Sequence, residues 1–388
     1  MTLIRNDILA ENGDFYTRNF QPTPREDTLI LNMGPQHPST HGVLRIILEI
    51  DGEYILRAEP VIGYVHRMHE KMAERLNYMQ YLPNMARVDY LHPLAWNWAY
   101  VGAVEKLMGL DVPQRAEYIR VITCELNRIS SHLLWWGAFL LDLGAFTPIL
   151  YAFADREKIA DILQKITGSR LTFSCYTFGG VTTDIDENFI AATKDFITYM
   201  RSRFPMYKNL VTDNLILRKR VEGIGEITPE ECRVYGATGP IARGSGISYD
   251  IRKAEPYSIY ERIKFNIPVH ENGDVLSRYM VRMREMEQSL SIIEQAISQL
   301  PAGPVLISKA PKKPKPEAGE VYFAVEGGRG KIGLHLVSDG SPKPYRIKLR
   351  SPSFSNLSLF PSIAHGTLLA DAVSILGSLD LVIPEIDR

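Results

Sequence analysis

The chain has 388 residues, of which 45% are apolar and 23% are charged, and 44 basic side chains against 45 acidic ones give a net charge of −1. This composition is typical of a globular protein and excludes disorder, collagen and coiled-coil rods. The length allows two or three domains, and the lack of a basic surplus argues against nucleic-acid binding. The first twenty residues have no apolar core, so we expect no signal peptide.

An antiparallel sheet is predicted for residues 28–60, where apolar and polar residues alternate, with a hairpin turn at Asp51-Gly52. The first two strands of this sheet are separated by GPQHPSTHG, a loop rich in glycine and proline. His37 and His41 lie in this loop, where polar side chains often meet a ligand. The residues alone leave a structural and a functional role open for both histidines.

Helical periodicity dominates from about residue 63 to residue 300. An apolar seam spaced by three and four residues from Ile119 to Leu140 predicts a helix of about 30 residues after Pro113. A similar seam predicts a second long helix that follows Asp274 and is stopped by Pro301. Shorter helices are predicted for 66–80, 92–109, 155–167 and 186–203.

One apolar stretch, Leu133 to Ala154, is long enough to cross a membrane. Asp142 near its middle would be costly in lipid, and Gly144 and Pro148 interrupt its second half. We therefore expect a buried helix of a soluble bundle, which leaves the role of Asp142 to be explained.

The last part of the chain is predicted to be mostly β-structure. Residues 309–317 are a Pro-Lys loop, residues 320–340 a hairpin, and the strand PYRIKLRSPSF precedes one short helix and a tail over 362–388. The turn EGGRGK lacks the spacing of a phosphate-binding loop, so a hairpin turn is favoured. His66 and Glu70 share a predicted helical face but have no third zinc ligand at a recognisable spacing.

The three cysteines, Cys124, Cys175 and Cys232, form no C-x-x-C pair. A Cys-rich metal or iron–sulfur site is therefore not available within this chain, and the cysteine count fits a reducing compartment. The predicted organisation is α+β and predominantly α, with β-segments at 1–62 and 305–361, a helical bundle at 63–304 and a terminal segment at 362–388.

Ordered sequence blocks span nearly the whole chain and resemble the quinone-binding D subunit (49-kDa type) of respiratory complex I, also called NDH-1. They are NMGPQHPSTHGVLR, GYVHRMHEKMAE, ELNRISSHLL, LDLGAFTP, GGVTTD, RVEGIG, TGPIARGSGISYDIRK, RIKLRSPSFSNL and LGSLDLVIPEIDR. The resemblance implies a bundle like that of the nickel–iron hydrogenase large subunit, with antiparallel β appendages near both termini. A nickel–iron centre needs thiolates, and the corresponding segments here, HRMHEKM and LDLVIPEIDR, contain no cysteine. Hydrogenase activity is therefore excluded.

The resemblance implies a pocket for the quinone headgroup, lined by His37, His41 and Tyr90. Quinone reduction creates negative charge on two oxygens, which hydrogen-bond donors stabilise and which must gain two protons. His41 and Tyr90 match the two family residues that supply these donors, because imidazole and phenol can each give a proton. Asp142 matches the family carboxylate that orients the histidine, so His41, Tyr90 and Asp142 are the expected catalytic residues.

The electrons are expected from an iron–sulfur cluster in a neighbouring B-type small subunit, close to Arg67 and Arg87. The C-type subunit and membrane-arm subunits are further expected partners, at the cytoplasmic face of the cell membrane, in a proton-pumping NADH:quinone oxidoreductase. A scaffold without chemistry and a free-standing hydrogenase or zinc enzyme are the alternatives. The electron donor to the complex is left open.

Several residues depart from the family pattern. Thr172 replaces a titratable histidine, which suggests a low-potential quinone such as menaquinone, and Thr177 replaces an arginine. Met68 and His69 stand where small residues are common, so the floor of the pocket is expected to differ.

Overall fold

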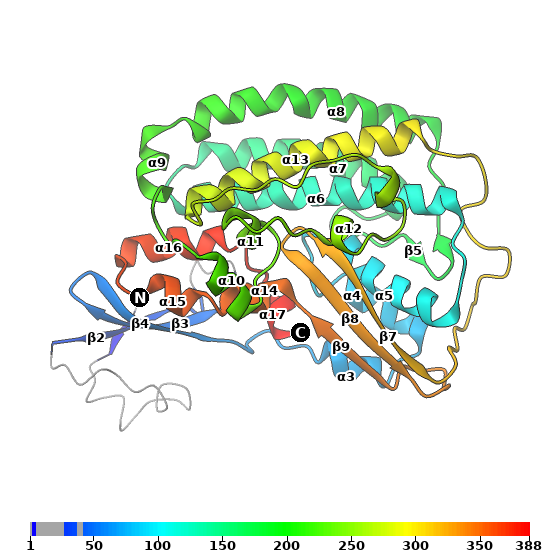
Figure 1. Cartoon of the computed structure of the whole chain (residues 1–388), viewed down its shortest axis with the longest axis horizontal. Coiled ribbons are helices and arrows are strands. Elements are labelled where there is room, and N and C mark those ends of the chain that lie inside the picture. Colours follow the sequence, from blue (N-terminus) through cyan, green and yellow to red (C-terminus); the bar gives the residue numbers. More distant parts are fainter. Residues whose placement is uncertain (1, 5–26, 37–41) are drawn as a thin grey trace.

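The computed structural model describes residues 2–4, 27–36 and 42–388 (Figure 1). The N-terminal sheet is antiparallel with the strand order β1-β2-β3-β4. Its strands are β1 (Thr2–Ile4), β2 (Leu29–Met33), β3 (Arg45–Asp51) and β4 (Tyr54–Val61). The three strands predicted from the alternating pattern are confirmed, and β1 is an additional short strand that the pattern did not predict.

Long helices run side by side through the upper half of the molecule and form its main layer (Figure 1). They are α6 (Gln114–Asp142), α7 (Thr147–Thr167), α8 (Glu187–Tyr207) and α13 (Val275–Ser298), while α5 (Pro93–Met108) lies below them. The two predicted long helices are confirmed as α6 and α13. The seam residues of α6 are fully buried, and α13 begins where the carboxylate of Asp274 accepts a hydrogen bond from the backbone N–H of Ser277.

Three shorter helices differ from the predicted ranges. The helix predicted over 66–80 is divided into α3 (His69–Ala73) and α4 (Tyr78–Met85), because Asn77 caps a new helix by accepting from the backbone of Gln80. The helix α7 begins eight residues earlier than predicted, since Pro148 occupies its first turn, where a missing N–H costs nothing. The helix α8 passes through Pro205 and continues into the π-helix η2 (Lys208–Thr212).

The apolar stretch from Leu133 to Ala154 is a helical corner and not one helix. It comprises the end of α6, a turn through Gly144, and the start of α7. Within the described ranges, no helix combines the length and apolar character that crossing a membrane requires.

The predicted C-terminal hairpin is confirmed as β7 (Gly319–Gly327) and β8 (Gly330–Ser338), followed by β9 (Arg346–Arg350). The sequence EGGRGK forms its turn, as expected, and residues 309–317 form an irregular loop. This hairpin packs closely on α5, since a Cβ atom at Gly102 would lie only 2.4 Å from the ring of Phe323.

The prediction of one short helix and a tail at the C-terminus was wrong. Residues 362–388 contain the end of α15 (Phe360–Ala364) and two further helices, α16 (Leu369–Ser378) and α17 (Ile383–Asp387). Before them, α14 (Pro352–Leu357) begins where the last predicted strand was expected to continue. The side chains from Ile375 to Ile383 are buried, because α16 and α17 lie between the long helices and the two larger sheets, β1–β4 and β7–β9 (Figure 1).

The connections between the main elements contain further short elements that the periodicity did not predict. They are β5 (Tyr176–Thr177), β6 (Gly180–Val181), α9 (Leu215–Val221), α10 (Pro229–Tyr235), α11 (Pro240–Gly244), α12 (Ile251–Ala254) and η3 (Tyr260–Arg262).

Buried ion pairs tie these connections to the long helices. Glu125 of α6 accepts from Arg252 at 3.0 Å and from Tyr260 at 2.8 Å, while Glu285 of α13 accepts from His132 at 2.9 Å and pairs with Arg243. The neighbouring arginines hold the pKa of each carboxyl at about 2, although burial opposes this shift. Both carboxylates are therefore ionised partners of the buried arginines.

Candidate functional site

The C-terminal segment lies against the turn that precedes α3. The carboxylate of Asp387 accepts hydrogen bonds from the backbone N–H groups of Gly63 at 2.8 Å and Val65 at 2.9 Å, and its carbonyl oxygen lies 2.7 Å from His66 Nδ1. The segments HRMHEKM and LDLVIPEIDR are therefore neighbours in space, although far apart in sequence.

The described flanks of the GPQHPSTHG segment are closely packed. A Cβ atom at Gly34 would lie 2.0 Å from the carbonyl oxygen of Leu44, and one at Gly42 would lie 2.8 Å from Ile383 Cγ1. Both positions have positive φ angles, 90° and 144°, which favour glycine. Gly42 thus contacts the helix α17. The predicted site residues His37 and His41 themselves lie outside the described residues.

Tyr90 is held by a turn that Asp89 organises. The carboxylate oxygen Oδ1 of Asp89 accepts from the backbone N–H groups of Leu91 at 2.9 Å and His92 at 3.1 Å. Asp89 and His92 are buried, whereas Tyr90 is 37% exposed. Partial burial raises the pKa of the Tyr90 phenol, and the positive charge of Arg329 opposes this shift. Tyr90 therefore presents a protonated phenol from a rigid backbone.

Arg329 is the centre of a buried group of charges behind Tyr90. Its guanidinium donates to Asp89 Oδ2 at 2.9 Å, to Asp380 Oδ1 at 3.3 Å and to Ser131 Oγ at 3.3 Å. The turn between β7 and β8 supplies this arginine, and the backbone N–H of Gly328 anchors the turn by donating to His92 Nδ1 at 2.9 Å. Arg329 was missed as a site residue, because EGGRGK was interpreted only through its backbone preferences.

Glu385 and Arg282 complete the group, which we call the Arg329 cluster: Arg329, Arg282, Asp89, Asp380 and Glu385. Arg282 lies 3.8 Å from Asp380, and Glu385 accepts a hydrogen bond from Ser353. Burial, together with the nearby carboxylates Asp89 and Asp380, raises the pKa of Glu385 to about 8. The cluster therefore brings together the turn of Tyr90, the β7–β8 turn, α13 and the C-terminal segment.

Asp142 occupies the last position of α6 and is half-buried. Ser131, which contacts Arg329, lies on the same helix. At 1.5 Å per residue, Asp142 is about 16 Å further along the helix axis than Ser131. Asp142 is therefore separated along α6 from Ser131, the α6 residue that contacts Arg329, and His41, the predicted link between Tyr90 and Asp142, is not among the described residues.

Arg67 and Arg87 are both exposed, as a contact with a neighbouring subunit requires. Arg87 donates to the carbonyl oxygen of Pro83. The expectation that His66 and Glu70 share a helical face was wrong, since His66 precedes α3 and Glu70 instead accepts from the backbone N–H of Leu349 at 3.0 Å. The described residues contain no cluster of three or more histidine, cysteine, aspartate or glutamate side chains suited to a metal ion.

The residues that depart from the family pattern lie in different parts of the fold. Met68 is 51% exposed with φ at 56°, a left-handed conformation that a small residue adopts more easily. His69 is buried, and burial lowers its pKa to about 4, so its imidazole is neutral. Thr172 is half-buried in the loop after α7, and the carbonyl oxygen of Thr177 accepts from Arg120 at 3.1 Å.

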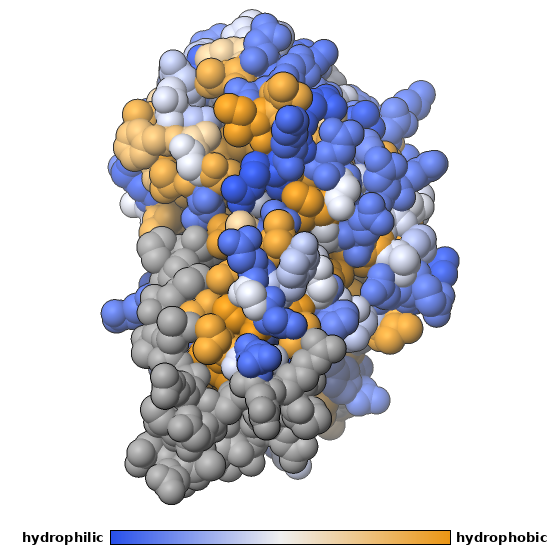
Figure 2. All heavy atoms as spheres, turned by 90° about the vertical axis from the view of Figure 1, so that its left-hand side faces the viewer, coloured by the Kyte–Doolittle hydropathy of each residue, from blue (hydrophilic) through white to orange (hydrophobic). Residues whose placement is uncertain are grey.

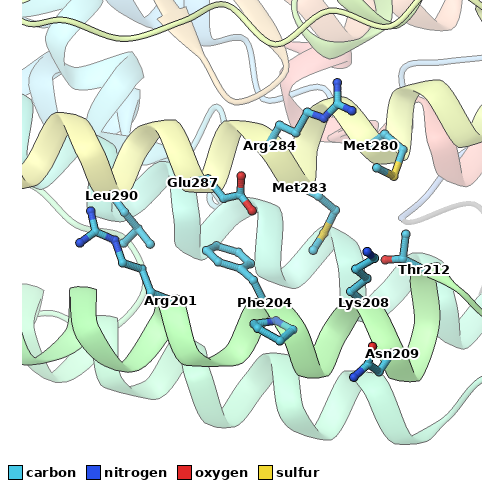
Figure 3. A pocket seen from close by; sticks show the side chains of 11 residues that line it. Arg201, Phe204, Lys208, Asn209, Thr212, Met280, Met283, Arg284, Glu287 and Leu290 are labelled. Carbon is cyan, nitrogen blue, oxygen red and sulfur yellow. The ribbon is translucent and has the colours of Figure 1, made fainter.

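A separate groove of about 820 Å³ lies between α8 and α13 (Figure 3). Phe204, Met283 and Leu290 give it an apolar floor, and Arg201, Lys208, Arg284 and Glu287 line it with charges. None of the predicted site residues contributes to this groove, so its volume does not identify the candidate site.

An apolar surface covers the end of the bundle near Asp142 (Figure 2). Its most exposed side chains are Phe146 (63%), Leu150 (56%), Leu215 (67%) and Ile216 (76%). A cavity of about 410 Å³ opens here between α6, α7 and α9, lined by Leu140, Leu143, Phe146, Leu210, Ile216 and Leu217 among others. We refer to this surface as the apolar end of the bundle.

Comparison with known proteins agrees with the resemblance seen in the sequence. Residues 142–318 and 307–388 match the family described as "Respiratory-chain NADH dehydrogenase, 49 Kd subunit". The chain is 59% identical to the D subunit of the NADH-quinone oxidoreductase of Desulfotalea psychrophila, over 94% of this chain and 98% of that protein. It is 57% identical to the corresponding protein of Syntrophobacter fumaroxidans (96% and 100%) and 50% identical to that of Geobacillus thermodenitrificans (94% and 99%). The chain therefore belongs to the family of the 49-kDa or D subunit of respiratory complex I, and it takes part in an oxidoreductase as one subunit of a membrane-bound complex.

Proposed function

We propose that this chain forms the pocket in which the quinone headgroup is bound, reduced and protonated. The observation that carries this proposal is the half-exposed phenol of Tyr90, which stands on a turn fixed by Asp89 and backed by Arg329. A phenol held in this way can donate a hydrogen bond to a quinone oxygen and then its proton. Gly42, the last residue of the GPQHPSTHG segment, packs against Ile383 in the C-terminal segment that also carries Asp380 and Glu385.

His41 is proposed as the second proton donor, with His37 as a further residue lining the pocket. Asp142 is proposed to orient the imidazole of His41 and to favour its cationic form, as carboxylates do for histidine. The half-buried position of Asp142 at the apolar end of the bundle is consistent with this role, because a quinone with a lipid tail needs an apolar approach.

The electrons are proposed to come from an iron–sulfur cluster in the adjacent B-type subunit. The exposed side chains of Arg67 and Arg87 fit a surface that such a subunit covers, and their positive charge would raise the potential of the cluster. The C-type subunit and the membrane-arm subunits are the other proposed neighbours, at the cytoplasmic face of the membrane and in a proton-pumping complex. Thr172, which cannot titrate near neutral pH, favours a low-potential quinone such as menaquinone.

The variant Tyr90→Phe tests the proposal, because it removes only the phenolic oxygen. In the assembled complex we expect quinone reduction to fall by about 100-fold, in the range found for general acids, while reduction of an artificial acceptor upstream of quinone is unchanged. Tyr345→Phe is the matched control, since Tyr345 is 64% exposed in the loop before β9. Full quinone turnover in Tyr90→Phe would instead support the scaffold alternative.

A further inference from the structure

Glu385 is a buried carboxyl group to which the proposed reaction gives no role. Its side chain is 0% exposed, Ser353 donates to its oxygen Oε2, and its oxygen Oε1 has no hydrogen-bond partner. A buried carboxylate with an oxygen that has no hydrogen-bond partner is costly, whereas a neutral carboxylic acid is tolerated. The environment of Glu385 therefore favours the protonated form.

The surroundings of Glu385 contain charges of both signs. Asp89 faces it from the turn before α5, Arg329 from the β7–β8 turn, Asp380 from the loop after α16, and Arg350 from the end of β9. Burial and the two carboxylates raise the pKa of Glu385 to about 8, while Arg329 and Ser353 act in the opposite direction.

Asp89 is the other carboxyl group of the cluster whose pKa burial raises. Its two oxygens accept three hydrogen bonds, from the backbone N–H groups of Leu91 and His92 and from Arg329. Such bonds stabilise the ionised form, and Glu385 has no equivalent set. Of these two carboxyl groups, Glu385 is therefore the one that holds the proton.

The charge of the Arg329 cluster then depends on Glu385. Within the cluster, Arg329 and Arg282 supply two positive charges and Asp89 and Asp380 supply two negative charges, while Arg350 adds a positive charge next to Glu385. Ionised Glu385 would add one negative charge beside Arg329, the arginine whose positive charge acts on Tyr90. Negative charge there disfavours a phenolate, as the effects of Asp89 and Asp380 on Tyr90 already show.

We propose that Glu385 is a positioning residue which stays protonated during turnover and so leaves Arg329 free to stabilise the phenolate that Tyr90 becomes. The inference rests on the proposed function of Tyr90. In that step the O–H bond of Tyr90 breaks, a new O–H bond forms on the quinone oxygen, and the complex supplies the two electrons. Glu385 acts through Arg329 and gives up no proton itself.

The pH profile of quinone reduction in the assembled complex tests this role. In the wild-type complex we expect the rate to fall about tenfold between pH 7 and pH 9 as Glu385 ionises, relative to the rate with an upstream artificial acceptor. The variant Glu385→Gln cannot ionise, so the decline in this window should be less than about twofold. A Glu385→Gln profile that keeps the wild-type decline would overturn the inference.

A second variant covers the case in which Glu385→Gln does not assemble. Ser353→Ala removes a hydrogen bond that favours the ionised form of Glu385, so the alkaline decline in rate should move to higher pH. A decline that stays at the wild-type pH contradicts the inference.

An infrared band of a buried carboxylic acid, present in wild type and lost in Glu385→Gln, gives a readout without quinone. If Tyr90→Phe lowers quinone reduction strongly but the pH profiles of Glu385→Gln and Ser353→Ala keep the wild-type decline, only this inference is wrong. If Tyr90→Phe is fully active, the proposed function itself fails.

Discussion

The sequence identified some residues of the candidate site and missed others, as a comparison of Tyr90 with Arg329 and Glu385 shows. Tyr90 was identified through its family motif, and the structure gives it the partial exposure that a donor needs. Arg329 and Glu385 were not identified. Neither local periodicity nor turn chemistry specifies which distant residues a side chain contacts in the folded protein. Both became visible only when distant turns met around one buried guanidinium.

At the residue scale, Asp142→Asn should leave the fold intact but slow quinone reduction by about tenfold or more, since an amide cannot favour a cationic imidazole. Thermal unfolding of the chain and quinone reductase activity of the assembled complex are the two measurements. Asp195→Asn, on the exposed face of α8, is the matched control. Unchanged turnover in Asp142→Asn would refute the orienting role.

The buried carboxylates Glu125 and Glu285 predict a loss of stability in acid. Their folded pKa values of about 2 lie below the ordinary value of a glutamate, about 4.3. The stabilisation is therefore complete above that ordinary value and is lost as pH falls toward the folded pKa. We expect the free energy of unfolding to drop by about 1–2 kcal/mol per carboxylate between pH 6 and pH 3.

Chemical unfolding of the full chain at these two pH values measures the effect. Glu285→Gln should be strongly destabilised at pH 6, by about 3–5 kcal/mol, because it removes a buried carboxylate that pairs with Arg243 and bonds to His132. Glu294→Gln, which breaks the exposed pair with Arg201, should change stability by less than about 1 kcal/mol. Equal effects of the two substitutions would show that burial of the pair is not what matters.

At the scale of the element, the sequence predicted centres of helices better than their ends. The seams of α6 and α13 are long enough to dominate local signals, so both helices were predicted nearly in full. Pro148 was interpreted as an interruption, but the first turn of α7 accepts it, and α8 extends past its predicted end through Pro205. Capping contacts such as that of Asn77, and not apolar periodicity, decided where helices divide.

The turn that carries Arg329 depends on close contact with the loop before α11. A Cβ atom at Gly239 would lie 2.5 Å from the carbonyl oxygen of Arg329, whereas one at Gly223 would have no neighbour within 4 Å. Both glycines have positive φ, 71° and 69°, so both alanine variants carry backbone strain, and the ψ of −148° at Gly239 makes its conformation especially unfavourable for alanine. We expect Gly239→Ala to be less stable than Gly223→Ala by about 1–3 kcal/mol, the cost of overpacking, and to lower quinone reduction.

Thermal unfolding and quinone reductase assays on the two variants measure how much more the close-packed backbone at Gly239 matters than the open position of Gly223. If both variants lose the same stability and activity, the contact between Gly239 and the Arg329 turn is not important for the site.

At the scale of the whole molecule, three distant parts of the chain meet in one region. The strands and turns before α3, the β7–β8 turn and the C-terminal helices are joined through Asp387 and Arg329. The overall class, helices with small antiparallel sheets, followed from periodicity and from the family resemblance. The burial of the C-terminal segment did not, since short helices filling a tertiary gap have no periodic signal of their own.

The most direct test of the account is a structure of the assembled complex with a quinone bound at the site of reduction. We predict that the Tyr90 hydroxyl lies about 3 Å from one headgroup oxygen, with Arg329 behind the phenol. A headgroup bound elsewhere, such as in the α8–α13 groove, or a Tyr90 side chain covered by another subunit and out of reach of the quinone, would contradict it.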